Sequence, residues 1–180
     1  MSSSKLKILY VAAEVVPFAK TGGLADVAGA LPKQLAEMGH DVRIVLPRYK
    51  CVDRRKFGLR AATGSFPVPL NHDSVKMTVD QSNAIPDVPT YFLRCDPLYD
   101  RFSLYGQEDD DQRFVAYARG ILEMLPHLDW MPDVISCNDW HSCLVPVYLK
   151  TLYANKPGYD KIGTVLTIHN LAYQGSFSPH

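Results

Sequence analysis

The sequence predicts an α/β fold in which a parallel sheet is covered by helices on both faces. Short apolar runs that suit buried strands occupy residues 7–13, 42–46, 134–137 and 164–168. They alternate with segments whose apolar residues recur at helical spacing. Strands that are apolar along their whole length are typical of a parallel sheet buried on both sides. At 180 residues and 47% hydrophobic, the chain is expected to form one domain over residues 1–180.

The first predicted unit is strand, helix, strand. After the run Lys7 to Ala13, a loop leads into a helix from about Leu24 to Met38, and Gly39 suits its end. Pro32 lies inside this helix and cannot donate a hydrogen bond to the preceding turn. We therefore expect Pro32 to kink the helix or to divide it into two short pieces.

The middle of the chain has a different pattern. Short extended runs at Phe66 to Leu70, Val75 to Val79 and Thr90 to Leu93 are interrupted by prolines, which favours a hairpin-like excursion with edge strands where proline permits. A helix marked by Phe114 through Leu125 is expected after the acidic run at residues 108–111, because negative charge suits a helix N-terminus. Another helix is expected around Leu144 to Leu152.

Charge and composition exclude some partners. Nineteen basic and nineteen acidic residues cancel, so no net field attracts nucleic acid or an anionic membrane. The apolar run Ile8 to Ala13 is too short for a signal peptide or a membrane span, which predicts a soluble protein that is not exported. The four cysteines form no CxxC pair, as expected for reduced thiols.

Polar residues follow three of the predicted strands. Glu14 and the segment Lys20 to Asp26 follow the first, Asp139 and His141 follow the run at 134–137, and His169 with Asn170 follows the last. Ligands of open parallel sheets bind beyond the carboxyl ends of the strands. These side chains could therefore converge on one cleft.

The segment Lys20-Thr-Gly-Gly23 places a cation, a hydroxyl and two glycine amides before a helix. This arrangement suits a phosphate group, although neither GxxxxGK[ST] nor GxGxxG is present, which disfavours a nicotinamide dehydrogenase. The alternative is a tight turn with a solvated lysine. Asp26 in the first helical turn could simply complement the helix dipole.

The remaining candidates also have two interpretations. Glu14 is either a capped surface residue or an acceptor for a ligand hydroxyl. Asp139 and His141 could be an acid/base pair, sugar contacts, metal ligands or a helix cap, and capping is the commonest explanation. A metal site is disfavoured because the spacing matches no known zinc pattern. His169 could be a hydrogen-bonded histidine at a strand end, and Tyr99, Tyr105 and Tyr173 could stack on sugars or pack in the core.

Three segments together carry a family resemblance. Glu14-Val-Val-Pro-Phe-Ala-Lys-Thr-Gly-Gly-Leu-Ala-Asp-Val-Ala-Gly-Ala-Leu-Pro32 resembles the N-terminal signature of bacterial glycogen synthases and plant starch synthases. Asn138-Asp-Trp-His141 and Thr167-Ile-His-Asn-Leu-Ala-Tyr-Gln-Gly175 agree with it in order and position. The resemblance implies the N-terminal half of a GT-B glycosyltransferase, which has two Rossmann-like domains that face a cleft. It also implies transfer of glucose from ADP-glucose to the non-reducing end of an α-1,4-glucan with retention, without a metal or other cofactor.

The resemblance also implies roles for particular residues. Lys20, Gly22 and Gly23 would contact the donor phosphates, and Asp26 would support that loop. His169 would lie beside the transferred glucosyl group and would be catalytic together with Asp139 and Glu14. The remaining substrate contacts would come from Tyr105, His141 and Asn170. The partner for these groups would be the C-terminal nucleotide-binding domain, which this chain does not resemble.

One departure from the family pattern is Asn138, where members commonly have His. Asn keeps a hydrogen-bonding group but carries no titratable charge, which argues against an acid/base role there. Ala25 favours the bacterial pattern, and hence a cytoplasmic rather than a plastid location. The competing hypothesis from the sequence is a glucan-binding module without catalysis.

Overall fold

The structure, a computed structural model, describes residues 4–71 and 73–177. One eight-stranded sheet has the order β3-β5-β6-β2-β1-β7-β8, and β4 pairs with β5 off this path. The parallel part joins β6 (Thr90–Arg94), β2 (Asp41–Pro47), β1 (Lys7–Val11), β7 (Val134–Asn138) and β8 (Gly163–Thr167). The predicted α/β class is confirmed, with a mixed sheet that is mostly parallel.

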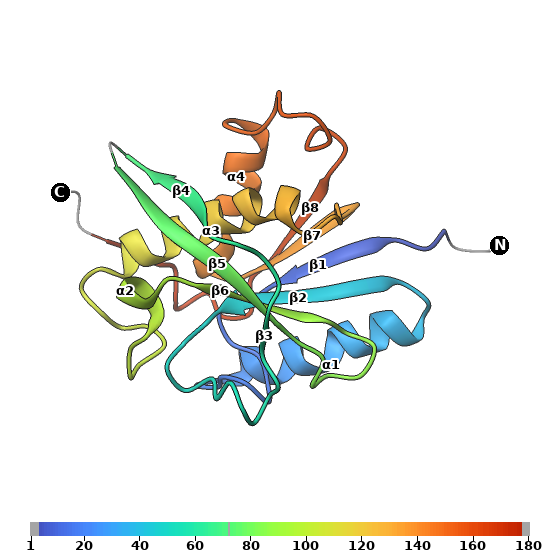
Figure 1. The fold of residues 1–180 in the computed structure, drawn as a ribbon, viewed down its shortest axis with the longest axis horizontal. Helices are drawn as coiled ribbons and strands as arrows, with labels where there is room; N and C mark the ends of the chain where they lie inside the picture. Colours follow the sequence, from blue (N-terminus) through green and yellow to red (C-terminus); the bar gives the residue numbers. More distant parts are fainter. Residues whose placement is uncertain (1–3, 72, 178–180) are drawn as a thin grey trace.

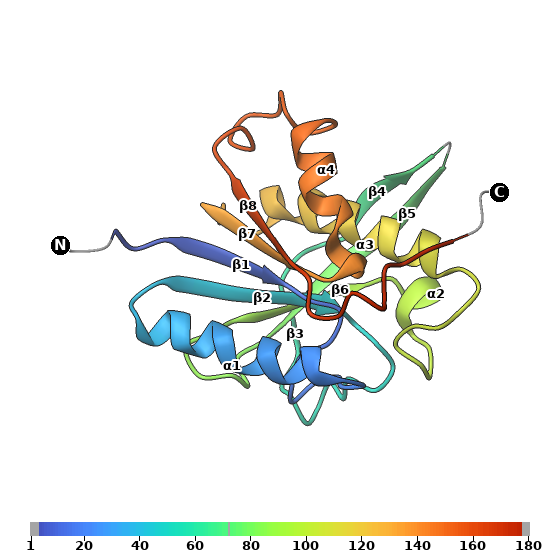
Figure 2. The same ribbon diagram turned by 180° about the vertical axis from the view of Figure 1, so that it is seen from behind.

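Helices cover both faces of the sheet, as the sequence predicted. Helix α1 (Gly23–Glu37) lies on one side, whereas α3 (Asp110–Met124) and α4 (Leu144–Lys150) lie on the other (Figures 1 and 2). The central strands β1 and β2 are almost fully buried between them. Among the described residues, no helix is both long enough and apolar enough to cross a membrane.

The structure contains the predicted hairpin, but the third extended run that was predicted with it is a strand of the main sheet. Strands β4 (Phe66–Leu70) and β5 (Asp73–Ser82) form an antiparallel hairpin that opposes Phe66 to Met77. Pro67 and Pro69 lie on the exposed side of β4, which pairs only with β5, as expected for proline in an edge strand. The segment Thr90 to Leu93, in contrast, is strand β6 of the main sheet.

Burial explains the position of β6. Its residues 90–93 are all buried, and the strand pairs in parallel with β2 and antiparallel with β5. A continuously apolar strand stabilises the protein more when both of its faces are covered than when it lies in a surface hairpin. The local sequence pattern predicts a hairpin strand here because the prolines before residue 90 dominate it. The two-residue strand β3 (Arg60–Ala61) was not predicted.

Helix α1 runs without interruption through Pro32, so the predicted division into two pieces is wrong. Pro32 is buried, as are Leu24 and Ala28 on the same helix. Burial of this apolar side offsets the lost backbone hydrogen bond. The helix ends where expected, because Gly39 adopts a positive φ of 98° that favours glycine.

Besides α1, the described residues form the long helix α3 and four short helical elements. The expected helix after the acidic run is α3, and the helix predicted to reach Leu152 ends at Lys150 as α4. No helix was predicted at α2 (Asp96–Tyr99) or at the 3₁₀ turns η1 (Leu125–His127) and η2 (Trp140–Ser142). Turn η2 matters for function because it follows the end of β7, carries the candidate His141 and is preceded directly by the candidate Asp139.

Candidate functional site

A cavity of about 1020 Å³ opens at the carboxyl ends of three adjacent parallel strands. The loops after β1, β7 and β8 all contribute to it, together with the loop before α3, so the predicted convergence on one cleft is confirmed. Its lining contains Glu14, Gly22, Gly23, Tyr105, Asp139, His141, His169 and Asn170, eight of the ten candidates from the sequence.

The other two candidates, Lys20 and Asp26, lie outside this lining and pair with each other. Lys20 Nζ is 2.6 Å from Asp26 Oδ1, and the side chains are 51% and 59% exposed. An ion pair this exposed contributes less than about 1 kcal/mol, so either partner is easily released to another charge. Asp26 therefore forms an ion pair with Lys20 and does more than complement the helix dipole.

The carboxylate of Glu14 holds the glycine loop, residues 20–23, through hydrogen bonds. Glu14 is 2% exposed, and its Oε2 accepts hydrogen bonds from the Thr21 amide, from Thr21 Oγ1 at 2.9 Å and from the Gly22 amide at 3.1 Å. A carboxylate with three donors on one oxygen is firmly oriented. The surface-residue alternative for Glu14 is therefore wrong.

Tyr105 lines the cavity and contacts the same loop. Its hydroxyl contacts Thr21 Oγ1 and lies 3.5 Å from Glu14 Oε1. Burial, with the nearby Glu14 charge, raises the pKa of the Tyr105 hydroxyl, so it stays protonated and can donate at neutral pH. Thr21 links the two residues. Its hydroxyl was predicted only as part of the phosphate-binding segment, because a threonine next to two glycines is common in ordinary turns.

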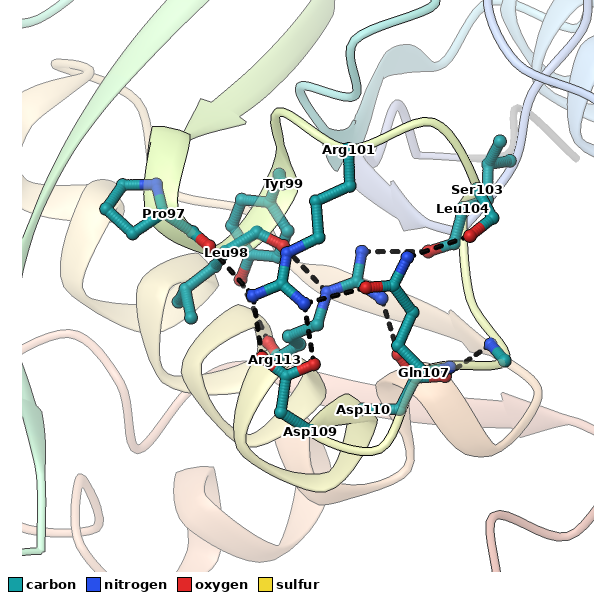
Figure 3. Close-up of polar contacts among 11 residues, drawn as sticks. Pro97, Leu98, Tyr99, Arg101, Ser103, Leu104, Gln107, Asp109, Asp110 and Arg113 are labelled. Carbon is teal, nitrogen blue, oxygen red and sulfur yellow. Dashed lines mark hydrogen bonds and ion pairs between the residues drawn. The ribbon is translucent and has the colours of Figure 1, made fainter.

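A buried network holds the segment that carries Tyr105 (Figure 3). Arg113 on α3 is fully buried, donates to the carbonyls of Leu98 at 2.7 Å and Leu104 at 2.9 Å, and pairs with Asp110. Asp110 in turn accepts from the Gly106 amide at 2.6 Å. These contacts fix the backbone on both sides of Tyr105.

Asp139 joins the ends of β7 and β8. Its amide donates to the Thr167 carbonyl at 2.9 Å, and its Oδ1 accepts from the His169 amide at 2.7 Å. It makes no side-chain capping bond to η2, so the capping explanation is wrong. The φ of 56° at Asp139 is uncommon for a residue with a side chain and indicates a constrained corner at the cavity edge.

His141 is a buried histidine whose hydrogen-bonding groups are unused. It is 5% exposed, and neither ring nitrogen has a partner among the described residues. It stacks on Trp140 with ring centroids 4.0 Å apart, and Tyr105 and Phe114 also pack against it. Burial, with the positive charge of Arg113, lowers its pKa to about 3, so the ring is neutral. The neutral ring carries one donor and one acceptor, and both nitrogens are buried in the cavity wall.

The segment after β8 forms the remaining wall. Asn170 Oδ1 accepts from the Ala172 amide at 2.9 Å, which turns the chain so that residues 172–177 line the cavity. Tyr173 is 70% exposed there, whereas Tyr99 is fully buried and donates to the Arg113 carbonyl, so Tyr99 is a core residue. Within the described ranges, no three His, Cys, Asp or Glu side chains are grouped to hold a metal ion.

Comparisons with known proteins agree with this architecture. The family model of the starch synthase catalytic domain matches residues 7–180. Glycogen synthase 1 of Geobacter metallireducens is 46% identical over 180 residues, covering 96% of this chain and 36% of the relative. Glycogen synthase of Desulforudis audaxviator is 43% identical, with 98% and 37% covered.

A solved structure shows the same fold. The catalytic domain of starch synthase IV from Arabidopsis thaliana, bound to ADP and acarbose, has a TM-score of 0.87 and 34% identity, covering 96% of this chain and 35% of that one. This chain therefore spans about a third of the length of the relatives that it matches. The chain belongs to the starch synthase catalytic domain family.

Proposed function

We propose that residues 1–180 belong to the acceptor-side, N-terminal domain of a retaining glucosyltransferase. The enzyme would transfer glucose from ADP-glucose to the non-reducing end of an α-1,4-glucan. The observation that carries the proposal is the shared cavity at the ends of β1, β7 and β8. It is lined by a neutral, buried histidine whose ring nitrogens have no partner among the described residues. Leaving such groups unpaired costs about 1–3 kcal/mol, which hydrogen bonds to sugar hydroxyls would offset.

The charge of the cavity favours a glucan on this side. Among the described lining residues there is no lysine or arginine, while Glu14, Asp110 and Asp139 supply acidic groups. Carboxylates, amides, hydroxyls and aromatic rings suit a neutral, polyhydroxylated chain better than a diphosphate. Tyr105 and Tyr173 both line the cavity, where their rings could stack on sugar rings.

The donor would approach at the glycine loop. Gly22 and Gly23 begin α1, whose N-terminal amides and dipole favour an anion, and a β-carbon at Gly23 would meet no atom within 4 Å. Lys20 would reach the donor phosphates after leaving Asp26. In this proposal His169 lies beside the glucosyl group, with Asp139 and Glu14 as the other catalytic candidates.

The nucleotide would be held mainly by a C-terminal domain that corresponds to the part of the relatives outside this chain. In the relatives that part makes up about two thirds of the length, since the chain covers about 36% of them. The bacterial relatives favour a cytoplasmic location. We expect purified 180-residue protein to elongate no glucan, because half of the donor site would be missing. Robust incorporation of glucose from ADP-glucose into glycogen by this chain alone would contradict the proposal.

A glucan-binding module without catalysis is the second candidate, and the cation-free cavity favours it. The two candidates differ in their response to the donor. Titration of ¹⁵N-labelled chain with ADP-glucose is expected to shift the amide signals of Gly22 and Gly23 if this is a transferase half. Saturable glucan binding with no nucleotide-induced shift at these amides would favour the module instead.

A further inference from the structure

Asn138 is a buried residue at the end of β7, and its side chain contacts both β1 and the segment that follows β8. It ends β7, is 1% exposed and uses both ends of its side-chain amide. One end faces Tyr10 of β1 and His169, which follows β8, and the other faces backbone carbonyls. Because the residue is buried and fully hydrogen-bonded, its contacts restrict how the neighbouring histidine can be protonated.

The orientation of the amide follows from its partners. Nδ2 lies 2.9 Å from the Val11 carbonyl oxygen and 3.2 Å from that of Ser136. A flipped amide would place its oxygen against two acceptors, so the flip is excluded. Asn138 Oδ1 must therefore face Tyr10 Oη at 3.0 Å and His169 Nε2 at 2.9 Å.

This orientation decides which groups donate. An amide oxygen only accepts hydrogen bonds, so both Tyr10 Oη and His169 Nε2 must carry the proton. Burial raises the pKa of the Tyr10 hydroxyl to about 12, which keeps it a donor. In the neutral ring of His169 the lone pair is then on Nδ1, which makes no hydrogen bond with any residue that the structure describes.

We propose that Asn138 is a positioning residue that fixes His169 as the Nε2–H tautomer, so that Nδ1 is presented as an acceptor to a ligand hydroxyl in the cavity. Asp139 Oδ1 holds the backbone of the same histidine through its amide at 2.7 Å. Ring and backbone are thus fixed by consecutive residues at the end of β7. The identity of the ligand rests on the proposed function, whereas the tautomer does not.

The test is the tautomer of His169 in the intact 180-residue chain. With ¹⁵N-labelled histidine at pH 8.5, about two units above the ordinary histidine pKa, long-range ¹H–¹⁵N spectra report the protonation of each ring nitrogen. His169→Gln assigns the signals. We expect a protonated Nε2 with a directly observable N–H signal, which solvent exchange hides in exposed rings, and an unprotonated Nδ1. An Nδ1–H ring, or the averaged mixture of a free histidine, would overturn the proposal.

Two variants separate positioning from folding. Asn138→Ala removes the acceptor and is expected to abolish the N–H signal and return Nδ1 to an exchange-averaged shift. Tyr10→Phe removes the other donor to the same oxygen and is expected to leave the His169 signals in place. If Asn138→Ala does not fold, the wild-type spectrum alone still decides the outcome. Glucan binding measured in the same samples is a separate readout, so a failed proposed function and a wrong tautomer give different results.

Discussion

Gly22 and Gly23 begin the same helix, but different neighbours surround them. A β-carbon on Gly22 would lie 3.5 Å from Glu14 Oε1, an ordinary contact within the protein. A β-carbon on Gly23 would enter open space at the cavity wall. No steric clash within the described chain requires glycine at position 23, so an added methyl group there would project into the cavity without displacing protein atoms.

Gly23→Ala is therefore expected to leave the free energy of unfolding unchanged within about 0.5 kcal/mol, because alanine suits a helix better than glycine. ADP-glucose binding should weaken, since the methyl group occupies the space in which a phosphate approaches the amides. Urea unfolding and ligand titration measure the two effects. Gly64→Ala, at another open position, is the control. Unchanged nucleotide binding in Gly23→Ala would remove this glycine from the donor site.

His141 gives a second prediction, based on pH. Its folded-state pKa is about 3, whereas the unfolded value is about 6.5. Between these values the unfolded chain binds a proton that the folded chain does not, so stability is full above about pH 6.5 and falls as the pH decreases. At pH 5.5 the loss should be about 1.4 kcal/mol relative to neutral pH.

His141→Phe removes this titration but keeps a ring against Trp140. The difference in unfolding free energy between the variant and the wild type should therefore change by about 1.4 kcal/mol from pH 7.5 to pH 5.5. Urea unfolding of both proteins at both pH values measures it, and other titrating groups cancel in the comparison. Parallel pH profiles would mean that His141 titrates normally in the folded protein.

At the scale of elements, the segment between β6 and α3 depends on two arginines with different surroundings (Figure 3). Arg113 is fully buried with Asp110, while Arg101 forms a bidentate pair with Asp109 in which the side chains are 28% and 33% exposed. The Arg101 guanidinium lowers the pKa of Asp109. Both arginines hold the segment that carries Tyr105, but only the buried one leaves an uncompensated charge when removed.

Arg113→Met is therefore expected to destabilise the protein by about 3–5 kcal/mol, because Asp110 remains buried without its partner. Arg101→Met should cost only about 1 kcal/mol, since water solvates the remaining groups. Urea unfolding of the two variants under identical conditions compares them directly. Equal losses would show that burial does not distinguish the two pairs.

The sequence predicts elements well where one pattern dominates. The strands β1, β2 and β7 and the helices α1 and α3 combine continuous or helical apolar spacing with clear end signals, and all were found. Strand β6 was misplaced because its pairing with β2, more than forty residues away, leaves no local mark. The short elements α2 and η2 depend on tertiary contacts and were missed for the same reason.

For the whole molecule, strand order determines the site. The adjacency of β1, β7 and β8 brings Glu14, Asp139 and His169 to one cavity, and the polar strand ends made this predictable. The pairing of Lys20 with Asp26 and the missing partners of His141 were not predictable, because they depend on side-chain placement. Of residues 172–177, which all line the cavity, only Tyr173 was predicted as a possible sugar contact, since the segment lacks any regular pattern.

The central claim is that this cavity binds an α-1,4-glucan, and titration of the ¹⁵N-labelled chain with maltoheptaose tests it most directly. We predict saturable shifts at residues that line the cavity, among them Tyr105, His141 and Tyr173, and none at Gln34 or Glu37 on the outer side of α1. The absence of saturable shifts, or shifts confined to residues outside the cavity, would contradict the account.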